Sequence, residues 1–305
     1  MKKHLAPILE LKKNYLEGDT ASPQDAAYGF WSLKKLIAIN YLIPQFGMLA
    51  RTGGFEHCYY LDLLAGSGIV NLKAGVSVPG SAVVALAATT SEPHFERYYF
   101  VENDQTKANL LRERLDRVNR SLQRKYEVRS GDCNAILPEI LDRIYALEPE
   151  HSCFLALFDP EGYLETAWAT IEILLGRGKG DLVFNFTEGV ARNVAKARSD
   201  DSYVPSLQRY FGAPENEWLQ YDGYDELIDY FGSKLQRVRQ IERTTFRIDV
   251  KENNRPLYGL LIATGSGGYG NIVRDLKKRL DPISVRDLES TYDQLVGRSK
   301  PITSY

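Results

Sequence analysis

The sequence predicts an α/β fold, with a doubly wound, mainly parallel sheet of seven strands, a terminal antiparallel hairpin and a helical insertion. Short apolar runs alternate with amphipathic stretches between residues 57 and 189. Such alternation favours a parallel sheet because a crossover between parallel strands needs a long connection, usually a helix. Two further extended runs follow each other with only a short turn between them, which is typical of a hairpin.

The amino-acid composition is that of a globular protein. Of 305 residues, 44% are hydrophobic and 26% are charged, and 38 basic residues against 40 acidic ones leave a net charge of −2. This composition excludes general disorder and argues against indiscriminate nucleic-acid binding, although it allows a local basic patch. The longest uncharged run, residues 36–50, contains Asn40 and Pro44 and is too short and too polar to cross a bilayer. We therefore expect a cytoplasmic protein with no membrane segment.

The cysteines and histidines show no pattern of a disulfide framework or a metal site. Three cysteines (Cys58, Cys133 and Cys153) contain no C-x-x-C pair, and four histidines (His4, His57, His94 and His151) have no ligand spacing. We expect reduced thiols and assign no metal.

The first predicted strand covers residues 59–64 and ends in a tight turn, Ala65-Gly66-Ser67-Gly68. Residues 71–79 contain Gly and Pro and are interpreted as a loop. Ser81 is the expected cap of an apolar helix that runs to residue 88. The next strands are expected at 98–102, 126–129, 153–158 and 181–186, and the helices between them at 105–125, 136–147 and 168–175.

The chain is expected to form one domain with four parts: N-terminal helices in 1–54, a nucleotide-binding core in 55–189, an insertion in 190–240, and a terminal hairpin and helices in 241–305. The insertion shows helical patches but no strand, and we expect it over the rim of the site. The hairpin strands are predicted at 244–250 and 257–263 with Asn253-Asn254 as the turn, and the last helices at 271–280 and 285–296. The arginine-rich stretch 112–129 is interleaved with acids, which favours a solvent-facing surface.

Candidate binding residues follow the first three strands. Ligands in open α/β sheets bind outside the carboxyl ends of the strands. The glycine turn fails as a dinucleotide fingerprint because Asn71 stands at its third glycine position, so a nicotinamide-dependent oxidoreductase is disfavoured. Glu102 can accept hydrogen bonds from both hydroxyls of a ribose and Asp132 from an exocyclic amine, although either can instead cap the next helix. Together they point to S-adenosylmethionine.

The same residues resemble motifs of the class I methyltransferases: Leu61-Asp62-Leu63-Leu64-Ala65-Gly66-Ser67-Gly68, Val101-Glu102-Asn103-Asp104 and Ser130-Gly131-Asp132. More narrowly, residues 30–265 resemble the three-Cys-motif partner (TcmP) family, through Gly80-Ser81, Gly131-Asp132, Asp159-Pro160-Glu161-Gly162 and Asn185-Phe186. The methyltransferase resemblance implies that S-adenosylmethionine is held by Asp62, Ala65, Gly66, Ser67, Gly68, Glu102, Asp132 and Cys133. The TcmP resemblance implies a partner protein that carries the three-cysteine motif, which this chain lacks.

The fourth strand ends in Asp159-Pro160-Glu161, the predicted catalytic residues. In amino-group methyltransferases a similar turn accepts hydrogen bonds from the target NH2 and stacks an aromatic ring on the base. Here Glu161 replaces the expected Pro or Phe, and the nearest aromatic residue, Tyr163, is displaced. In the alternative interpretation, Asp159 caps the following helix.

Asn185, Glu188 and Arg192 follow the fifth strand and can reach a substrate, although Arg192 is more typical of a solvated helix position. The predicted function is methyl transfer to a nitrogen, on a nucleic acid. The alternative is a non-catalytic subunit that serves a three-cysteine-motif protein in nucleic-acid modification or phage defence.

Overall fold

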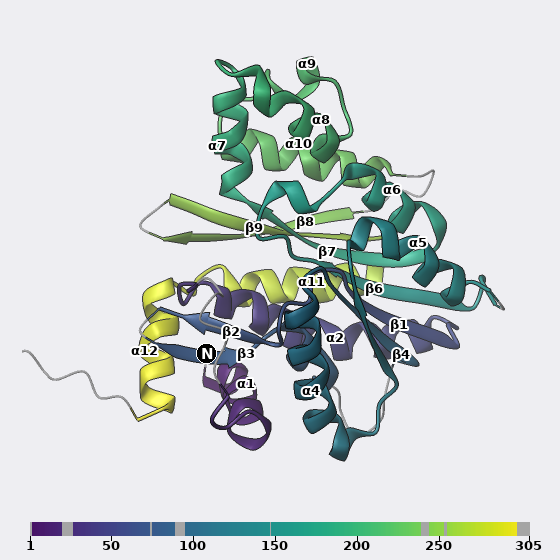
Figure 1. Ribbon diagram of the computed structural model, residues 1–305, viewed down its shortest axis with the longest axis vertical. Coiled ribbons are helices and arrows are strands. Elements are labelled where there is room, and N and C mark those ends of the chain that lie inside the picture. The colour runs from purple at the N-terminus through teal and green to yellow at the C-terminus, as the bar shows by residue number, and fades with distance from the viewer. Residues whose placement is uncertain are drawn as a thin grey trace, which may run out of the picture.

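A seven-stranded sheet organises the chain in the computed structural model, which describes residues 2–19, 27–73, 75–88, 95–146, 148–238, 244–252 and 255–297. The strand order is β5-β4-β1-β6-β7-β9-β8 (Figure 1). The first five strands of this order pair in parallel, and β9 pairs antiparallel with both β7 and β8. The predicted sheet and its terminal hairpin are confirmed. The strands are β1 (His57–Asp62), β4 (Arg97–Glu102), β5 (Tyr126–Ser130), β6 (Ser152–Phe158), β7 (Lys179–Thr187), β8 (Thr244–Glu252) and β9 (Arg255–Thr264).

The sheet is buried on both faces, and its strands alternate between two apolar cores. On β6, Leu155 and Leu157 enter one core, while Phe154 and Ala156 enter the other. Because successive side chains of a strand point to opposite faces, a strand covered on both sides reads as a continuous apolar run. This is why residues 153–158 could be recognised as a strand.

Helices cover both faces. The first core includes residues of α1 (Lys2–Tyr15), α2 (Ser32–Thr52), α3 (Ser81–Ala87), α4 (Gln105–Leu122), α11 (Gly267–Leu280) and α12 (Val285–Leu295). The second core includes residues of α5 (Cys133–Ile144), α6 (Trp168–Arg177), α7 (Glu188–Ala197), α8 (Val204–Phe211), α9 (Glu215–Trp218) and α10 (Tyr224–Arg237). Two short 3-10 helices, η1 (Tyr163–Glu165) and η2 (Asp201–Tyr203), complete the set in the described ranges.

The insertion forms its own helical layer, with α7 to α10 grouped above β8 and β9 in Figure 1. Its aromatic side chains pack on the sheet: the Phe231 ring lies 4.8 Å from Phe184 and 5.4 Å from Phe186 of β7, centroid to centroid. We expected the insertion over the rim of the site, but none of its described residues lines the cleft presented below. The aromatic packing attaches it to a face of the sheet instead.

The stretch interpreted as a loop contains a β-hairpin, and that prediction was wrong. Strands β2 (Ile69–Leu72) and β3 (Val76–Pro79) pair antiparallel, and Tyr28 forms a parallel bridge with Leu72. The strands are too short to give a clear alternating pattern. Ser81 is the first residue of α3, whose N-cap is Gly80. The predicted turn at Asn253-Asn254 lies outside the described residues, as do His94, Leu147 and Gln240.

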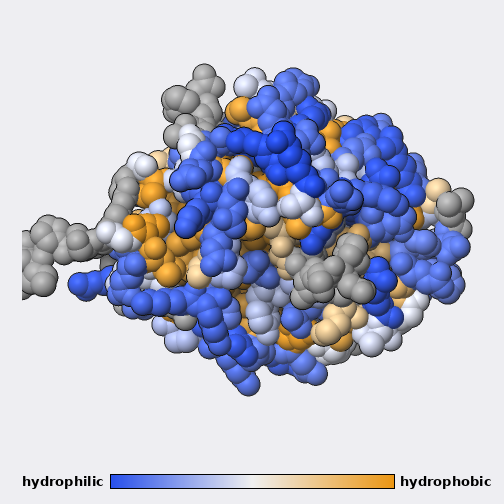
Figure 2. All heavy atoms as spheres, turned by 90° about the horizontal axis from the view of Figure 1, so that it is seen from below, coloured by the Kyte–Doolittle hydropathy of each residue, from blue (hydrophilic) through white to orange (hydrophobic). Residues whose placement is uncertain are grey.

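The molecular surface is mixed in character. Hydrophilic residues dominate the face seen in Figure 2, with apolar residues visible between them. Among the described residues no helix combines the length and apolarity that a membrane span requires. The three cysteines are buried free thiols, and the Sγ atoms of Cys58 and Cys153 lie 3.5 Å apart on neighbouring strands.

Candidate functional site

A cleft opens at the carboxyl ends of the parallel strands and consists of two adjoining hollows. The larger, about 260 Å³, is called the Tyr28 lobe, and the smaller, about 130 Å³, the Asp132 lobe. The Tyr28 lobe is lined by the turn 65–68, Ser81, residues of the N-terminal segment 28–36, the triplet 159–161, and residues of β2, β7 and β9. The Asp132 lobe is lined by Glu102, Asn103, Asp132, Cys133 and Glu165. Both share Leu64, Gly66, Lys107, Asp159 and Glu161. Every predicted catalytic and cofactor-binding residue except Asp62 therefore lines the cleft.

The turn after β1 needs its glycines. Gly66 and Gly68 have φ angles of +63° and +84°, a left-handed region that costs other residues energy. A Cβ on Gly68 would also lie 3.0 Å from the Leu111 side chain. The turn thus presents backbone, with no side chain at Gly66 or Gly68, to the cleft.

Glu102 is oriented by backbone groups on both of its oxygens. Its Oε2 accepts from the N–H of Gly66 at 2.9 Å, and its Oε1 accepts from the N–H of Asp104 at 2.8 Å. Each carboxylate oxygen has two lone pairs, so both keep acceptor capacity toward a ligand. The cap of α4 is Asp104, which accepts from Thr106 and Lys107. Glu102 is therefore no helix cap, and that alternative is excluded at this position.

Asp132 does cap a helix. The residue is exposed, and its Oδ1 accepts from the backbone N–H and the side-chain amide of Asn134, at 2.9 and 2.6 Å. The next residue, Cys133, is buried, and burial raises the pKa of its thiol to about 12. Cys133 therefore lines the lobe as a neutral thiol.

Asp62, at the end of β1, is fully buried beneath the turn and lines neither lobe. Among the described residues no hydrogen bond of ordinary geometry reaches its carboxylate oxygens, although the Ser81 hydroxyl and the Leu64 N–H lie near enough to favour the charged form. Burial, reinforced by the charge of Asp159, raises the pKa of Asp62 to about 7. The side chain is thus poised between its two protonation states near neutral pH.

Asp159 lies between two donors from distant parts of the chain. Its Oδ2 forms an ion pair with Lys35 of α2, and its Oδ1 accepts from the Asn185 side-chain amide at 2.7 Å. The exposed fractions of the Lys35 and Asp159 side chains are 17% and 13%. The 3-10 helix that follows has Gly162 as its N-cap, so Asp159 caps no helix and the alternative interpretation is excluded here as well.

Glu161 lines both lobes, and the hydroxyl of Tyr28 donates to its carboxylate. Tyr163 turns away from the cleft: its hydroxyl lies 2.9 Å from that of Ser206, and its ring packs edge-on against Tyr210. The displacement of this aromatic residue, expected from the sequence, is confirmed.

Several lining residues could not be recognised as site residues in the sequence, namely Tyr28, Trp31, Lys35, Leu257 and Tyr258. The N-terminal segment enters the cleft through the bridge between Tyr28 and β2. The Tyr258 hydroxyl donates to the Trp31 carbonyl at 2.7 Å, which ties β9 to the start of α2. The one available signal was the concentration of aromatic residues at 28–31, immediately before a long helix.

Two further predictions concern charged residues outside the cleft. Arg192 is 71% exposed and pairs with Glu188 at 2.7 Å, so it is a solvated helix residue. The stretch 112–129, expected to face solvent, contains Arg114, which is 4% exposed. That expectation was wrong for Arg114 because its charge is compensated inside the protein.

One group of metal-binding residue types also lies at the opposite end of β1. Ligand atoms of Glu56, His57 and Glu148 lie within 4.8 Å of one another. The imidazole of His57 is engaged on both nitrogens, by Glu96 at 2.5 Å and Glu148 at 3.2 Å. The hydrogen bond to Glu96 is the main cause that raises the pKa of His57. Both imidazole nitrogens already engage carboxylates, so this arrangement leaves neither nitrogen of His57 directed at a metal ion.

Comparison with known proteins identifies no matching family model and no matching curated relative. Solved structures with a similar arrangement include an O-methyltransferase from Bacillus cereus in complex with SAH, at 14% identity, with 86% of this chain and 90% of that chain covered and a TM-score of 0.41. Trm1 from Pyrococcus horikoshii, with S-adenosyl-L-methionine, shows 10% identity, coverage of 85% and 57%, and a TM-score of 0.40. An rRNA methylase from Streptococcus thermophilus shows 14% identity, coverage of 73% and 96%, and a TM-score of 0.37.

Proposed function

We propose that this protein is an S-adenosylmethionine-dependent methyltransferase that acts on an amino nitrogen of a nucleic-acid base. The observation that carries the proposal is the Glu102 carboxylate, held beside the glycine turn by backbone N–H groups on both oxygens. A carboxylate held in this way can accept from the two hydroxyls of a ribose. The geometry thus supports the cofactor that the order of the motifs suggested.

The residues of the cleft fit this cofactor. The turn 65–68 offers backbone without bulky side chains, and Glu102, Asp132 and Glu161 supply negative charge around a site for a sulfonium and an ammonium group. When bound, S-adenosylmethionine supplies an electrophilic methyl group. Glu102 would hold its ribose, Asp132 and the Cys133 edge would face its adenine, and the turn would contact its methionine part.

Asp159 is the residue proposed to orient the acceptor. Its carboxylate is fixed by Lys35 and Asn185 and can accept a hydrogen bond from an acceptor N–H, which raises electron density on that nitrogen. The Pro160 carbonyl is a second candidate acceptor for the same amino group. Fixing the nitrogen lone pair in line with the methyl carbon would supply most of the rate through proximity.

The Tyr28 lobe supports a planar acceptor. Tyr28, Trp31 and Tyr258 give it aromatic walls, and the Lys73 ammonium lies 5.1 Å from the centre of the Trp31 ring. Aromatic rings stack on nucleobases, and a lysine nearby can meet a phosphate. These features favour a base over an aliphatic amine.

A second candidate function is a non-catalytic subunit that serves a three-cysteine-motif protein in nucleic-acid modification or phage defence. The observation that favours it is the pairing of Asp159 with Lys35, because the acceptor-binding carboxylate is already engaged. Glu161 adds to this case, since it stands where an aromatic residue would stack on a base.

Isothermal titration with S-adenosylmethionine tests cofactor binding. We expect Glu102→Ala to weaken binding about 100-fold, since two hydrogen bonds to a charged group are lost. Asp159→Asn should change the affinity less than about twofold, because Asp159 is assigned to the acceptor. Heats too small to measure for the wild type at millimolar ligand would contradict cofactor binding.

Transfer of a tritiated methyl group to DNA, RNA and protein mixtures then separates the two functions. The methyltransferase predicts label in a nucleic acid and its loss by about 100-fold in Asp159→Asn. Cofactor binding without label in any acceptor would favour the partner subunit.

A further inference from the structure

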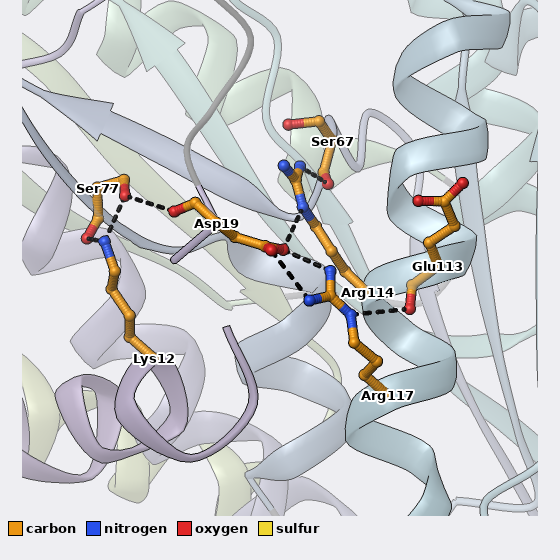
Figure 3. Close-up of polar contacts among 7 residues, drawn as sticks. All are labelled: Lys12, Asp19, Ser67, Ser77, Glu113, Arg114 and Arg117. Atoms are coloured by element: carbon orange, nitrogen blue, oxygen red, sulfur yellow. Dashed lines mark hydrogen bonds and ion pairs between the residues drawn. The ribbon is translucent and has the colours of Figure 1, made fainter. Parts of the chain in front are cut away.

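The buried guanidinium of Arg114 connects the glycine turn to Asp19, in the stretch 2–19 that contains α1 (Figure 3). Arg114 is 4% exposed, and its Nη1 donates to the carbonyl of Ser67 at 2.6 Å. Its Nε donates to the Asp19 carboxylate at 3.2 Å. A buried charge is costly unless it is paired, so the carboxylate of Asp19 stabilises Arg114 in its position beside the turn.

Asp19 is itself held firmly. Arg117 donates to both of its carboxylate oxygens, at 2.9 Å to Oδ1 and at close range to Oδ2. The hydrogen bonds from Arg117, with a smaller contribution from Arg114, hold the pKa of Asp19 below its usual value. The Lys12 ammonium of α1 donates to the Ser77 carbonyl of β3 at 2.7 Å, which fixes the same segment against the hairpin.

The turn is therefore anchored from two sides. Glu102 accepts from the N–H of Gly66 on the side of the cleft, and Arg114 donates to the carbonyl of Ser67 from below. Asp19 lines neither lobe of the cleft, and it lies 95 residues from Arg114 in the sequence. Asp19 therefore affects the turn through its hydrogen bond to the Arg114 guanidinium.

We propose that Asp19 is a positioning residue, which holds the turn 65–68 in its ligand-accepting shape through Arg114. The link to ligand affinity rests on the proposed function. Without the carboxylate, Arg114 would lose the counter-charge that Asp19 supplies, and it would move toward water and release the Ser67 carbonyl. The stretch 2–19 then contributes to ligand binding even though α1 lies outside the cleft.

Hydrogen–deuterium exchange and titration on matched variants test this proposal. In Asp19→Asn we expect the amides of residues 64–69 to exchange about tenfold faster and the dissociation constant for S-adenosylmethionine to rise about tenfold, because one charged hydrogen bond is lost. Asp19→Glu should restore part of both effects. Arg120→Gln is the control, because it removes an exposed arginine from the same helix and leaves the contacts of Asp19 with Arg114 and Arg117 intact.

The outcomes decide between the proposals. Unchanged exchange of residues 64–69 in Asp19→Asn, or an equal increase in Arg120→Gln, would overturn the role of Asp19. A wild type that gives no heat with S-adenosylmethionine would end the proposed function, while the exchange data would still decide whether Asp19 holds the turn. A lower melting temperature with unchanged exchange at the turn would show a structural role only.

Discussion

The two lobes of the cleft are built in different ways. The Asp132 lobe takes Gly66, Glu102 and Asp132 from the ends of three neighbouring parallel strands. The Tyr28 lobe depends on contacts between distant segments: Tyr28 and Glu161 are 133 residues apart, Lys35 and Asp159 are 124 apart, and Trp31 and Tyr258 are 227 apart. A binding surface made by local motifs thus adjoins one that exists only after the whole chain has folded.

Asp62, buried at the end of β1 and outside both lobes, gives the largest expected effect on stability. Its pKa of about 7 lies above the value of about 3.9 for an unfolded Asp, so the folded state binds the extra proton between these values. Stability contributed by this group is therefore greatest at low pH and falls as the pH rises toward 7, by up to about 3 kcal/mol between pH 5 and 8.

Asp62→Asn removes the titration, so we expect its stability relative to the wild type to improve by that amount from pH 5 to pH 8. Urea unfolding at pH 5, 6, 7 and 8 measures the difference. Parallel profiles for the two proteins would show that Asp62 titrates normally.

Lys35→Met should show whether stability and cofactor binding depend on different lobes. Removing one partner of a mostly buried ion pair leaves the Asp159 charge uncompensated, and we expect a loss of about 2 kcal/mol in unfolding free energy. The affinity for S-adenosylmethionine should stay within about twofold, because Lys35 pairs with Asp159, which is assigned to the acceptor, and does not line the lobe that contains Glu102. Lys35→Arg is the matched control and should keep most of the stability. A large loss of cofactor affinity in Lys35→Met would show that the lobes are coupled.

His57, at the far end of β1, gives the smallest expected effect on the unfolding free energy. Glu96 and Glu148 raise the pKa of His57 in the folded protein. Their interaction with the imidazole therefore contributes stability that is complete below the unfolded-state pKa of about 6.5 and disappears as the pH rises through the folded-state pKa. The side chains are about a third or more exposed, so we expect His57→Gln to cost less than about 1 kcal/mol at pH 6 and nothing at pH 9. Urea unfolding at both values measures it, and a deficit that grows with pH would contradict the assignment.

The contrast between the lobes explains how far the sequence could predict the site. Strand ends at Glu102, Asp132 and Asp159 follow from apolar runs and their neighbours, because a central parallel strand has to be apolar on both faces. Lys35 carries no local signal, and the only one at Tyr28 is the concentration of aromatic residues at 28–31, since the roles of both residues are set by partners more than 100 residues away. Arg114 was misread for the same reason: the arginine-rich helical pattern gives no indication that Asp19 lies against it.

The doubly held carboxylate of Glu102 has a consequence for ligand capture. The side chain adopts its working rotamer on folding, so its conformational entropy is already lost before any molecule arrives. Affinity then depends on how completely a ligand uses the acceptor positions already in place. Under the proposed function, a compound without neighbouring hydroxyls would leave those acceptor positions unsatisfied and should bind less tightly than one that carries a vicinal diol.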